Sequence, residues 1–262
     1  MDTMAIFEPH VYNMVLAIMT GLAVVVFISL QFVEAGYGVA YTRKWGPTVN
    51  NRLGWVLMEA PVFVAMAALW YLSPRRGEIA PAVMASIFML HYFQRSFVFP
   101  LLIRGKGKMP LSVILMGLVF NVINAYMLGG WLFYVSPENY YGGVEWLGSW
   151  QFIVGTALFA WGMFTNLQSD SIIRHLRKPG DTRHYIPRGG MFKYVASANY
   201  LGEFAEWCGY ALLTWSWAGG VFALWTFANL APRARKLHKR YEREFGDEYT
   251  SLHRRYIIPF IY

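Results

Sequence analysis

The segment from Asn166 to Trp207 carries the densest group of side chains that could bind a ligand. Both of its ends have polar residues at helical spacing, which places each set on one face of a helix. A basic loop that contains glycine joins the two polar stripes, which are Asn166, Asp170 and Arg174 at one end and Asn199, Glu203 and Glu206 at the other. This arrangement predicts a site for a charged ligand, although a solvated loop between frayed helix ends would give the same spacing.

A second group of polar side chains interrupts apolar stretches upstream. Glu59 lies in the run WVLMEAPVFVAMAALW, and His91, Tyr92 and Arg95 lie in MLHYFQRSFVF. An ionisable group inside a hydrophobic run is costly and indicates a function. A Tyr hydroxyl with a carboxyl partner is a suitable donor to a carbonyl oxygen that gains negative charge during a reaction. We therefore predict that Glu59 and Tyr92 form such a pair; the alternative is a structural ion pair between Glu59 and Arg95.

The composition indicates that these residues belong to a membrane protein. The chain has 262 residues, of which 56% are hydrophobic and only 15% charged, whereas a soluble domain carries about a quarter charged residues. The formal charge of +8 comes from Lys and Arg in the gaps between apolar runs, a membrane pattern that argues against a nucleic acid partner. The one cysteine, Cys208, excludes an internal disulfide and a cysteine-based metal site. We expect no bound metal.

The apolar runs predict an all-α fold, a polytopic integral membrane protein with seven transmembrane helices. Since neither an internal repeat nor a low-complexity linker is evident, residues 1–262 are expected to form a single domain. No basic region precedes the first run, so we expect no cleavable signal peptide. The expected spans are roughly Val11–Phe32, Gly54–Leu72, Ala80–Ile103, Leu111–Val135, Leu147–Leu167, Val195–Leu213 and Gly219–Ala231.

The distribution of basic residues predicts the orientation of these spans. Of the 23 Lys and Arg residues, 20 fall in segments that an odd number of spans places on one side. Only Arg75 and Arg76 fall on the other side, and Arg95 lies within a span. Because basic residues concentrate in the cytoplasm, we expect the N-terminus outside or in a lumen and the C-terminus in the cytoplasm. The loop of about residues 166–199 and the basic tail of about residues 232–262 then share the cytoplasmic side.

The chain carries none of the usual nucleotide motifs. Gly36-Tyr37-Gly38 lacks the third glycine of a dinucleotide fingerprint and follows no predicted strand, and no P-loop is found. Any nucleotide must therefore be held by helices and loops. Arginine suits phosphate, and Arg174, Arg177, Lys178 and Arg183 lie within ten residues. For the basic tail, attraction to anionic lipid headgroups, worth about 1 kcal/mol per basic residue, is the alternative.

A series of short motifs resembles the steroid 5α-reductase family from Trp55 to the C-terminus, and a bacterial homologue fits this resemblance. The block Asn166–Ala211 is the most specific part. The motifs are Trp55-Val56-Leu57-Met58-Glu59, His91-Tyr92-Phe93-Gln94-Arg95, Asn166-Leu167-Gln168-Ser169-Asp170, Leu176-Arg177-Lys178-Pro179-Gly180, Tyr185-Ile186-Pro187-Arg188-Gly189-Gly190, Ala198-Asn199-Tyr200, Gly202-Glu203, Glu206-Trp207-Cys208-Gly209-Tyr210-Ala211 and Ile258-Pro259-Phe260.

The resemblance implies a membrane reductase that uses NADPH to saturate the 4,5 double bond of a 3-oxo-4-ene steroid, with the hydride added at C5. By motif, Glu59 and Tyr92 match the pair that polarises the 3-keto group, and Trp55 matches a wall of the steroid pocket. The residues that match the cofactor site are Tyr37, Arg95, Arg104, Asn166, Asp170, Arg177, Tyr185, Asn199, Glu203, His238, Tyr241 and Arg254. Departures from the family pattern are Gln94, Gln168, Arg188 and Leu237, and either Lys106 or Lys108 takes the basic position after Arg104.

Other activities are compatible with the same residues. A reductase of a linear enone lipid, of polyprenol or long-chain enoyl type, would share the cytoplasmic chemistry. A membrane methyltransferase that uses S-adenosylmethionine would also have a polar, basic C-terminal segment. A receptor or transporter would leave Glu59 and Tyr92 unexplained. The expected partners are the steroid substrate and the lipid bilayer, and we expect a monomer in either a bacterial inner membrane or the endoplasmic reticulum.

Overall fold

Helices dominate the computed structural model, which describes residues 5–33, 45–105, 107–178, 181 and 183–262. The predicted all-α class is confirmed for these residues. The long helices are α1 (Pro9–Phe32), α2 (Asn51–Leu72), α3 (Ile79–Phe93), α5 (Leu111–Gly130), α6 (Trp150–His175), α7 (Ala198–Thr214) and α8 (Trp217–Phe245). The short elements are η1 (Ala5–Phe7), β1 (Thr48–Asn50), the π-turn η4 (Gln94–Val98), α4 (Phe99–Leu102), β2 (Lys108–Pro110), the π-turn η5 (Trp131–Val135), η6 (Gly143–Gly148), η7 (Gly190–Lys193) and α9 (Asp247–Thr250).

Polar side chains define where several of these helices begin. The side-chain oxygens of Asn50, Ser149 and Ser216 accept hydrogen bonds from backbone N–H groups in the first turns of α2, α6 and α8, at 2.8, 3.2 and 3.0 Å. Each bond satisfies a donor that the helix itself leaves unpaired. The antiparallel pair β1–β2, with Val49 opposite Met109, joins the entry of α2 to the entry of α5. Local sequence thus sets the start of three helices that line the site described below.

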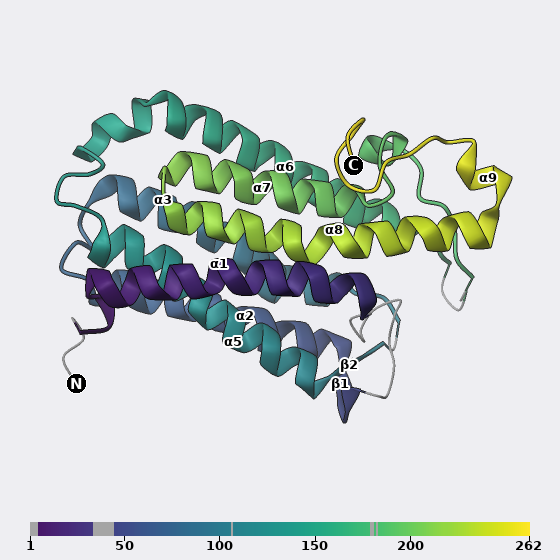
Figure 1. Ribbon diagram of the computed structural model, residues 1–262, viewed down its shortest axis with the longest axis horizontal. Coiled ribbons are helices and arrows are strands. Elements are labelled where there is room, and N and C mark those ends of the chain that lie inside the picture. Colours follow the sequence, from purple (N-terminus) through teal and green to yellow (C-terminus); the bar gives the residue numbers. More distant parts are fainter. Residues whose placement is uncertain (1–4, 34–44, 106, 179–180, 182) are drawn as a thin grey trace.

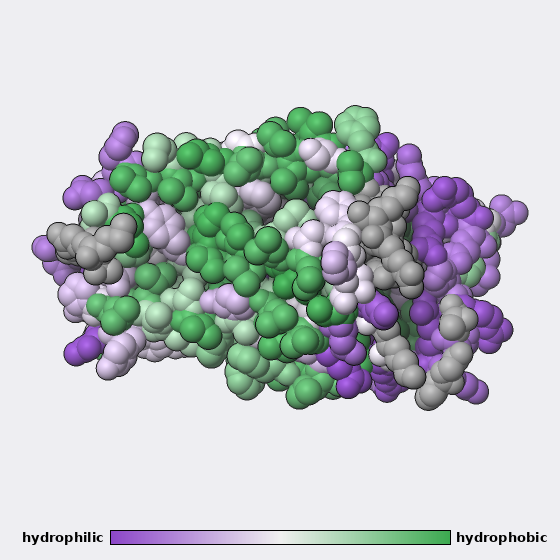
Figure 2. Space-filling model, turned by 90° about the horizontal axis from the view of Figure 1, so that it is seen from below, coloured by the Kyte–Doolittle hydropathy of each residue, from purple (hydrophilic) through white to green (hydrophobic). Residues whose placement is uncertain are grey.

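Three of the described helical segments are long and apolar enough to cross a membrane, namely Pro9–Phe32, Asn51–Leu72 and Leu111–Val135. Their outer faces expose large apolar side chains such as Val25, Val64 and Leu115, each more than half exposed. Figure 2 shows apolar residues across the middle of one face and hydrophilic residues gathered at the end that carries the last turns of α8. An exposed apolar surface of this kind is that of an integral membrane protein.

The other four expected spans coincide with helices that are shorter or more polar. Helices α3 and α7 have 15 and 17 residues, and α6 and α8 become polar toward their C-terminal ends. Helix α6 continues to His175 and α8 to Phe245, beyond the ends of the expected spans. The predicted loop from residue 166 therefore starts only after His175, and its first polar stripe lies on a rigid helix.

The long helices lie side by side along the longest axis of the molecule, with α7 between α6 and α8 (Figure 1). Helix α1 packs on α8, and α2 packs on α5. Helices α6 and α7 approach most closely, through Gly155 and Gly162 on α6 and Gly202 and Gly209 on α7. A Cβ atom added to Gly162 would lie 2.6 Å from the carbonyl oxygen of Gly202. Only glycine allows this backbone contact, which aligns the polar residues of the two helices.

The C-terminal segment completes the fold at the opposite end from the N-terminus (Figure 1). Its backbone joins the residues that precede α7: the N–H of Ala196 donates to the carbonyl of Arg255 at 2.8 Å, and the N–H of Arg255 donates to the carbonyl of Tyr194 at 2.9 Å. Ile257 is fully buried beside Val195 and Leu230. The last residues of the chain are therefore a structural part of the end that carries the basic loop.

Candidate active site

A cavity of about 270 Å³ lies between α2, α3, α5, α6, α7 and α8. Its walls combine aromatic rings with buried amides and carboxylates, the mixture expected of a ligand site. Both upstream candidates, Glu59 and Tyr92, and both polar stripes contribute to it. The residues that line it are Trp55, Met58, Glu59, His91, Tyr92, Arg95, Phe99, Gly117, Phe120, Asn121, Asn166, Asp170, Asn199, Tyr200, Glu203, Trp207, Phe222, Trp225, Thr226, Asn229, Leu230 and Arg233.

Two asparagines of α5 hold the first pair of candidate residues. The side-chain amide of Asn121 donates to Glu59 Oε2 at 3.3 Å and to the carbonyl of Met58 at 2.7 Å. The amide of Asn124 donates to the hydroxyl oxygen of Tyr92 at 3.2 Å, and both residues are buried. The expected direct hydrogen bond between Glu59 and Tyr92 is not formed among the described residues. Because the Tyr92 oxygen accepts from Asn124, its own proton is left available for a ligand.

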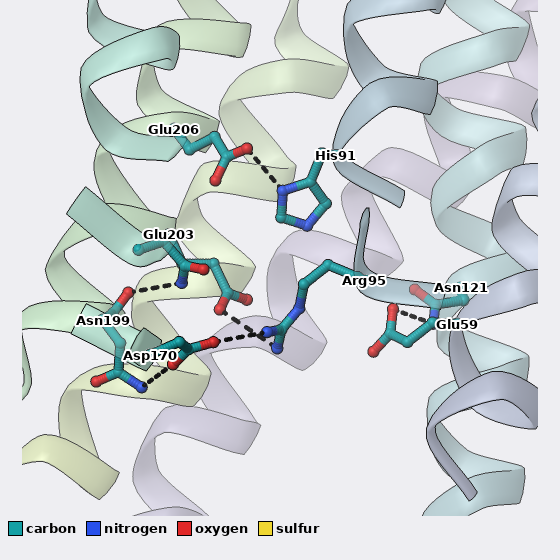
Figure 3. A network of polar contacts seen from close by, with 9 residues as sticks. Glu59, His91, Arg95, Asn121, Asp170, Asn199, Glu203 and Glu206 are labelled. Atoms are coloured by element: carbon teal, nitrogen blue, oxygen red, sulfur yellow. Dashed lines mark hydrogen bonds and ion pairs between the residues drawn. The ribbon is translucent and has the colours of Figure 1, made fainter. Parts of the chain in front are cut away.

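Arg95 is the centre of an ionic cluster that faces Glu59 across the cavity (Figure 3). Its guanidinium lies 3.5 Å from Asp170 and 3.9 Å from Glu203, and it stacks on the rings of Trp55 and Phe99 at 4.8 and 4.6 Å. The alternative prediction of a Glu59–Arg95 ion pair was wrong, because Glu59 is bonded to Asn121 instead. Arg95 belongs to the π-turn η4, whose wider turn directs a side chain at an angle that a regular helix would not.

The two polar stripes meet where α6 contacts α7. The amide of Asn166 donates to the backbone carbonyl of Asn199 at 3.0 Å, and the amide of Asn199 donates to Asp170 at 3.4 Å. The close glycine contact between the helices brings these groups within hydrogen-bond reach. Asp170 and Glu203 then share Arg95. The result is a polar wall of amides and carboxylates from α6, α7 and η4 on one side of the cavity (Figure 3).

A buried pair of His91 and Glu206 lies deeper along the same wall. His91 Nδ1 is 2.6 Å from Glu206 Oε1, and the two side chains are 6% and 1% exposed. The ring of His91 also contacts the rings of Tyr92 and Trp207 edge-on, with centroids 5.0 and 4.5 Å apart. Sequence reasoning noted both residues and missed their pairing. The turn of α7 between Glu203 and Glu206 gives each carboxylate a different partner, Arg95 for Glu203 and His91 for Glu206.

The remaining candidates do not line the cavity but surround the end of the molecule that holds the C-terminal segment. Arg104 donates to the carbonyl of Arg174 at 3.2 Å, and Arg177 is exposed. Tyr185 donates to Asp181 at 2.6 Å. Tyr37 lies outside the described residues. His238, Tyr241 and Arg254 surround the ring of Tyr249, at the junction of α8 with α9.

The loop between α6 and α7 is tied both to itself and to α8. Hydrogen bonds from Arg183 and Tyr185 hold the pKa of the Asp181 carboxyl well below its usual range. His184 lies 2.6 Å from Glu244 of α8, and this hydrogen bond lowers the pKa of the Glu244 carboxyl. Arg188 pairs with Glu248 at 3.0 Å. These contacts keep the basic loop close to the basic tail, as expected from the charge distribution.

Sequence reasoning missed Asn121, Thr226 and Asn229, which line the cavity, and Asn124, which does not line it but bonds Tyr92. Two asparagines three residues apart in the apolar run GLVFNVINAY are a signal of the same kind as Glu59. A polar side chain at that spacing within a span faces one direction and needs a partner. The oxygen Oδ1 of Asn229 is buried with no hydrogen-bond partner among the described residues. It is an acceptor that a ligand could satisfy.

Comparison with known proteins assigns this site to a family. Residues 107–262, more than half of the chain, match the family model described as 3-oxo-5-alpha-steroid 4-dehydrogenase. The chain is 41% identical over 248 residues to 3-oxo-5-alpha-steroid 4-dehydrogenase 1 of Mus musculus, covering 92% of each protein. It is 35% identical over 241 residues to a steroid 5-alpha-reductase of Arabidopsis thaliana, covering 90% of each. The chain therefore belongs to the 3-oxo-5-alpha-steroid 4-dehydrogenase family of oxidoreductases, which act on a CH–CH group.

Proposed function

We propose that this chain is a membrane-embedded reductase that uses NADPH to saturate the 4,5 double bond of 3-oxo-4-ene steroids. The observation that carries the proposal is the single cavity that joins a buried phenol donor, Tyr92, to the polar wall of Asn166, Asp170, Asn199 and Glu203. A steroid ketone needs the first, and a nicotinamide nucleotide needs the second. Relatives whose names give the same activity support the substrate class.

The residues present fit NADPH in chemistry as well as in place. The carboxylates and amides of the polar wall suit the carboxamide and the ribose hydroxyls, and the partnerless Asn229 Oδ1 offers a further acceptor. Arg254 is buried with Nε and Nη1 lacking partners among the described residues. Together with Arg177 and Arg104, it offers guanidinium groups for phosphate. When bound, the reduced nicotinamide supplies the hydride that C5 accepts.

The role of Tyr92 in this proposal is to polarise the 3-oxo group. The hydrogen bond from Asn124 fixes the phenol oxygen and leaves its proton free, so Tyr92 donates to the substrate oxygen as negative charge develops there. Glu59, held by Asn121, faces the same cavity and accepts from polar groups near the ketone. Arg95 positions Asp170 and Glu203 and carries the stacked ring of Trp55.

We further propose that seven helical segments cross the bilayer. Residues 79–102 form one nearly continuous helix through α3, η4 and α4, long enough for a span. Helices α6 and α8 are also long enough, and α7 is almost wholly surrounded by them. The N-terminus then lies outside or in the lumen and the C-terminus in the cytoplasm. We also propose that the enzyme is a monomer.

Labelling of single cysteines checks this topology. In a Cys208→Ala background, Glu138→Cys between α5 and α6 should react with an impermeant maleimide only from outside. Ser251→Cys after α9 should react only from the cytoplasmic side. Reaction of both positions from the same side would contradict an odd number of spans.

NADPH oxidation by the purified protein tests the proposed activity. We expect turnover with 3-oxo-4-ene steroids and none with matched steroids that lack the 3-oxo group. Turnover of a panel of linear enones tests the alternative of a lipid reductase, and a binding assay for S-adenosylmethionine tests the alternative of a methyltransferase. Turnover confined to linear enones would replace the steroid by a lipid substrate, and failure with every enone would refute the reductase.

Tyr92→Phe and Glu59→Gln test the residues. Loss of a hydrogen-bond donor to a developing oxyanion costs about 10²–10³ in rate. We therefore expect turnover by Tyr92→Phe to fall by that factor while the dissociation constant for NADPH is unchanged. Glu59→Gln should also lower turnover with little effect on NADPH. Near-normal turnover by Tyr92→Phe would remove Tyr92 from the reaction.

A further inference from the structure

The pair formed by His91 and Glu206 has no role in the proposed function so far, although burial of two ionisable side chains is energetically costly. Burial of two ionisable side chains in a membrane protein costs several kcal/mol unless they are paired. Aromatic rings surround this pair, among them Trp207 and Tyr92. The paired side chains are nearly inaccessible, at 6% and 1% exposure. Well-packed apolar residues would give at least equal stability at such a position, so a chemical role is the better account.

The two ring nitrogens of His91 face different surroundings. Glu206 binds Nδ1 of the imidazole and does not itself line the cavity, whereas His91 does. The second ring nitrogen, Nε2, makes no hydrogen bond to any residue that the structure describes. In Figure 3 it points away from Glu206, toward the side of the cavity that holds Arg95. A carboxylate on Nδ1 orients the ring, so that in the imidazolium form Nε2–H would be a donor into the cavity.

The proposed reduction needs such a donor. As C5 receives a hydride from the reduced nicotinamide, the C4=C5 π bond breaks and its electron pair moves toward the 3-oxo oxygen, which gives an enolate. One proton must then form a bond to C4. Once a steroid and a cofactor fill the cavity, the deep part lined by Trp207, Phe222 and Trp225 has little room for water.

The carboxylates that line the cavity and Tyr92 are committed elsewhere. Tyr92 donates to the 3-oxo oxygen in the proposed function, and Asp170 and Glu203 share Arg95 as carboxylates. Glu59 accepts from Asn121. His91 is adjacent to Tyr92 along α3, and their rings are in contact. His91 is thus the cavity residue best placed to protonate C4, the carbon next to the carbonyl.

We propose that His91, protonated and held by Glu206, is the proton donor to C4. The N–H bond at Nε2 breaks, a C–H bond forms at C4, and the imidazole becomes neutral while Nδ1–H stays bonded to Glu206. A proton from water restores the charged pair after the product leaves. This inference rests on the proposed function, since it concerns the second half of the same reduction.

Reaction in D2O tests the assignment, because the source of the proton determines the face on which deuterium enters C4. We expect the wild-type protein to place deuterium on one face. His91→Gln should lower steroid turnover by about 10²–10⁴, and the residual product should carry deuterium on both faces because water replaces the histidine. Glu206→Gln should slow the reaction less and keep one face. Ser86→Ala, whose hydroxyl bonds only the Ala82 carbonyl of the same helix, is the matched control and should behave as the wild type.

A second measurement isolates the proton step from hydride transfer. The saturated 3-oxo product, bound with oxidised cofactor, should exchange one C4 hydrogen with D2O on the wild-type protein and not on His91→Gln. The NADPH dissociation constant, measured for each variant, reports on folding and should not change. Two results would overturn the role of His91. One is exchange by His91→Gln at the wild-type rate, and the other is a His91→Gln product in which deuterium still enters only one face of C4. An inactive wild-type protein would instead overturn the proposed reduction itself.

Discussion

At the scale of single residues, the hydrogen bonding of Tyr92 is the feature on which the proposed chemistry depends. A phenol that both donates and accepts within the protein has nothing left to offer a ligand. Tyr92 accepts from Asn124 and donates to no described residue. Asn124 is fully buried, so water cannot take its place in the hydrogen bond. The asparagine therefore orients the tyrosine, a task that sequence reasoning assigned to Glu59.

Asn124→Leu removes this hydrogen bond with little change of volume. The phenol loses its fixed direction, and we expect kcat to fall by up to about tenfold, the equivalent of about 1.4 kcal/mol, which is within the range for one hydrogen bond. Affinity for NADPH should stay the same, because Asn124 does not line the polar wall. Steady-state kinetics with a 3-oxo-4-ene steroid provides the measurement. A larger loss for Asn121→Leu than for Asn124→Leu would mean that Glu59, not Tyr92, limits the reaction.

His238 gives the protein a dependence on pH. Burial is the main cause that lowers the pKa of its imidazole, and the neutral ring accepts from the Tyr249 hydroxyl at 2.9 Å and lies 3.1 Å from Glu242. Since the folded pKa is below the unfolded value of about 6.5, the unfolded chain binds the proton more readily. The contribution to stability is therefore complete above the unfolded pKa and is lost as the pH falls through the folded pKa.

We expect the midpoint temperature of thermal unfolding of the wild-type protein, without cofactor, to decrease as the pH is lowered from about 7.5 to about 5.5. His238→Phe keeps the aromatic packing against Tyr249 and Tyr256 but cannot be protonated, so its midpoint should fall less over the same range. Thermal unfolding in detergent, followed by fluorescence, compares the two proteins. Equal pH dependence in both would assign the effect to other groups.

At the scale of elements, the spacing of α6 and α7 decides whether the polar wall exists. Four glycines bring the two backbones into contact, and that contact places Asn166 beside Asn199 and both near Asp170. The glycines recur seven residues apart on each helix, at Gly155 and Gly162 and at Gly202 and Gly209. A wider separation would break the hydrogen bonds across the interface before it altered either helix.

Gly162→Ala and Gly202→Ala test this interface. Each added Cβ would overlap backbone atoms of the opposite helix, so we expect losses of at least about 1–3 kcal/mol in unfolding free energy. Affinity for NADPH should fall with them, because the polar wall separates. Gly21→Ala on α1 is the control, since nothing lies within 4 Å of its Cβ position. Stability of Gly162→Ala equal to that of Gly21→Ala would show that the helices are not in contact.

The elements also show where prediction from sequence succeeds and where it stops. Hydropathy located all seven long helices, because each carries an apolar run, and helical spacing correctly placed Asn166 with Asp170. The segment of about residues 166–199, expected to be a loop with helical ends, is helical as far as His175 because α6 continues through its first polar residues. The π-turn at Gln94–Val98 has no local signature. The partners of Arg95 and His91 come from α6 and α7, more than 70 residues away, and only the folded chain brings them together.

At the scale of the whole molecule, the two ends of the bundle differ in how they are held. One end is closed by the connections from α2 to α3, from η5 to α6 and from α7 to α8. The other is assembled from the loop after α6, the last turns of α8 and the C-terminal segment, which hydrogen-bonds to the residues before α7. The residues expected to bind the cofactor phosphates, such as Arg254, depend on this assembly. Under the proposed function, affinity for NADPH therefore depends on the C-terminal segment as well as on the helices.

Ile257→Ala should reveal this dependence. The side chain is fully buried against Val195 and Leu230, and truncation of a buried isoleucine costs about 2–5 kcal/mol. We expect local loosening of the C-terminal segment, a weaker affinity for NADPH and a lower unfolding temperature. Ile261→Ala is the matched control, because its side chain is 78% exposed. Isothermal titration with NADPH and thermal unfolding distinguish the two, and identical behaviour would contradict a structural role for the terminus.

The pairing of the C-terminal segment with the residues before α7 has a consequence for biosynthesis. A growing chain emerges with its N-terminal part first, so the residues before α7 are made before the segment that pairs with them. Arg254 and Ile257 can therefore reach their places only after α7 and α8 have been made. The newly made protein passes through a stage in which Glu59 and Tyr92 have been made but the proposed nucleotide site lacks Arg254. We expect a chain that stops before Arg254 to lose affinity for NADPH.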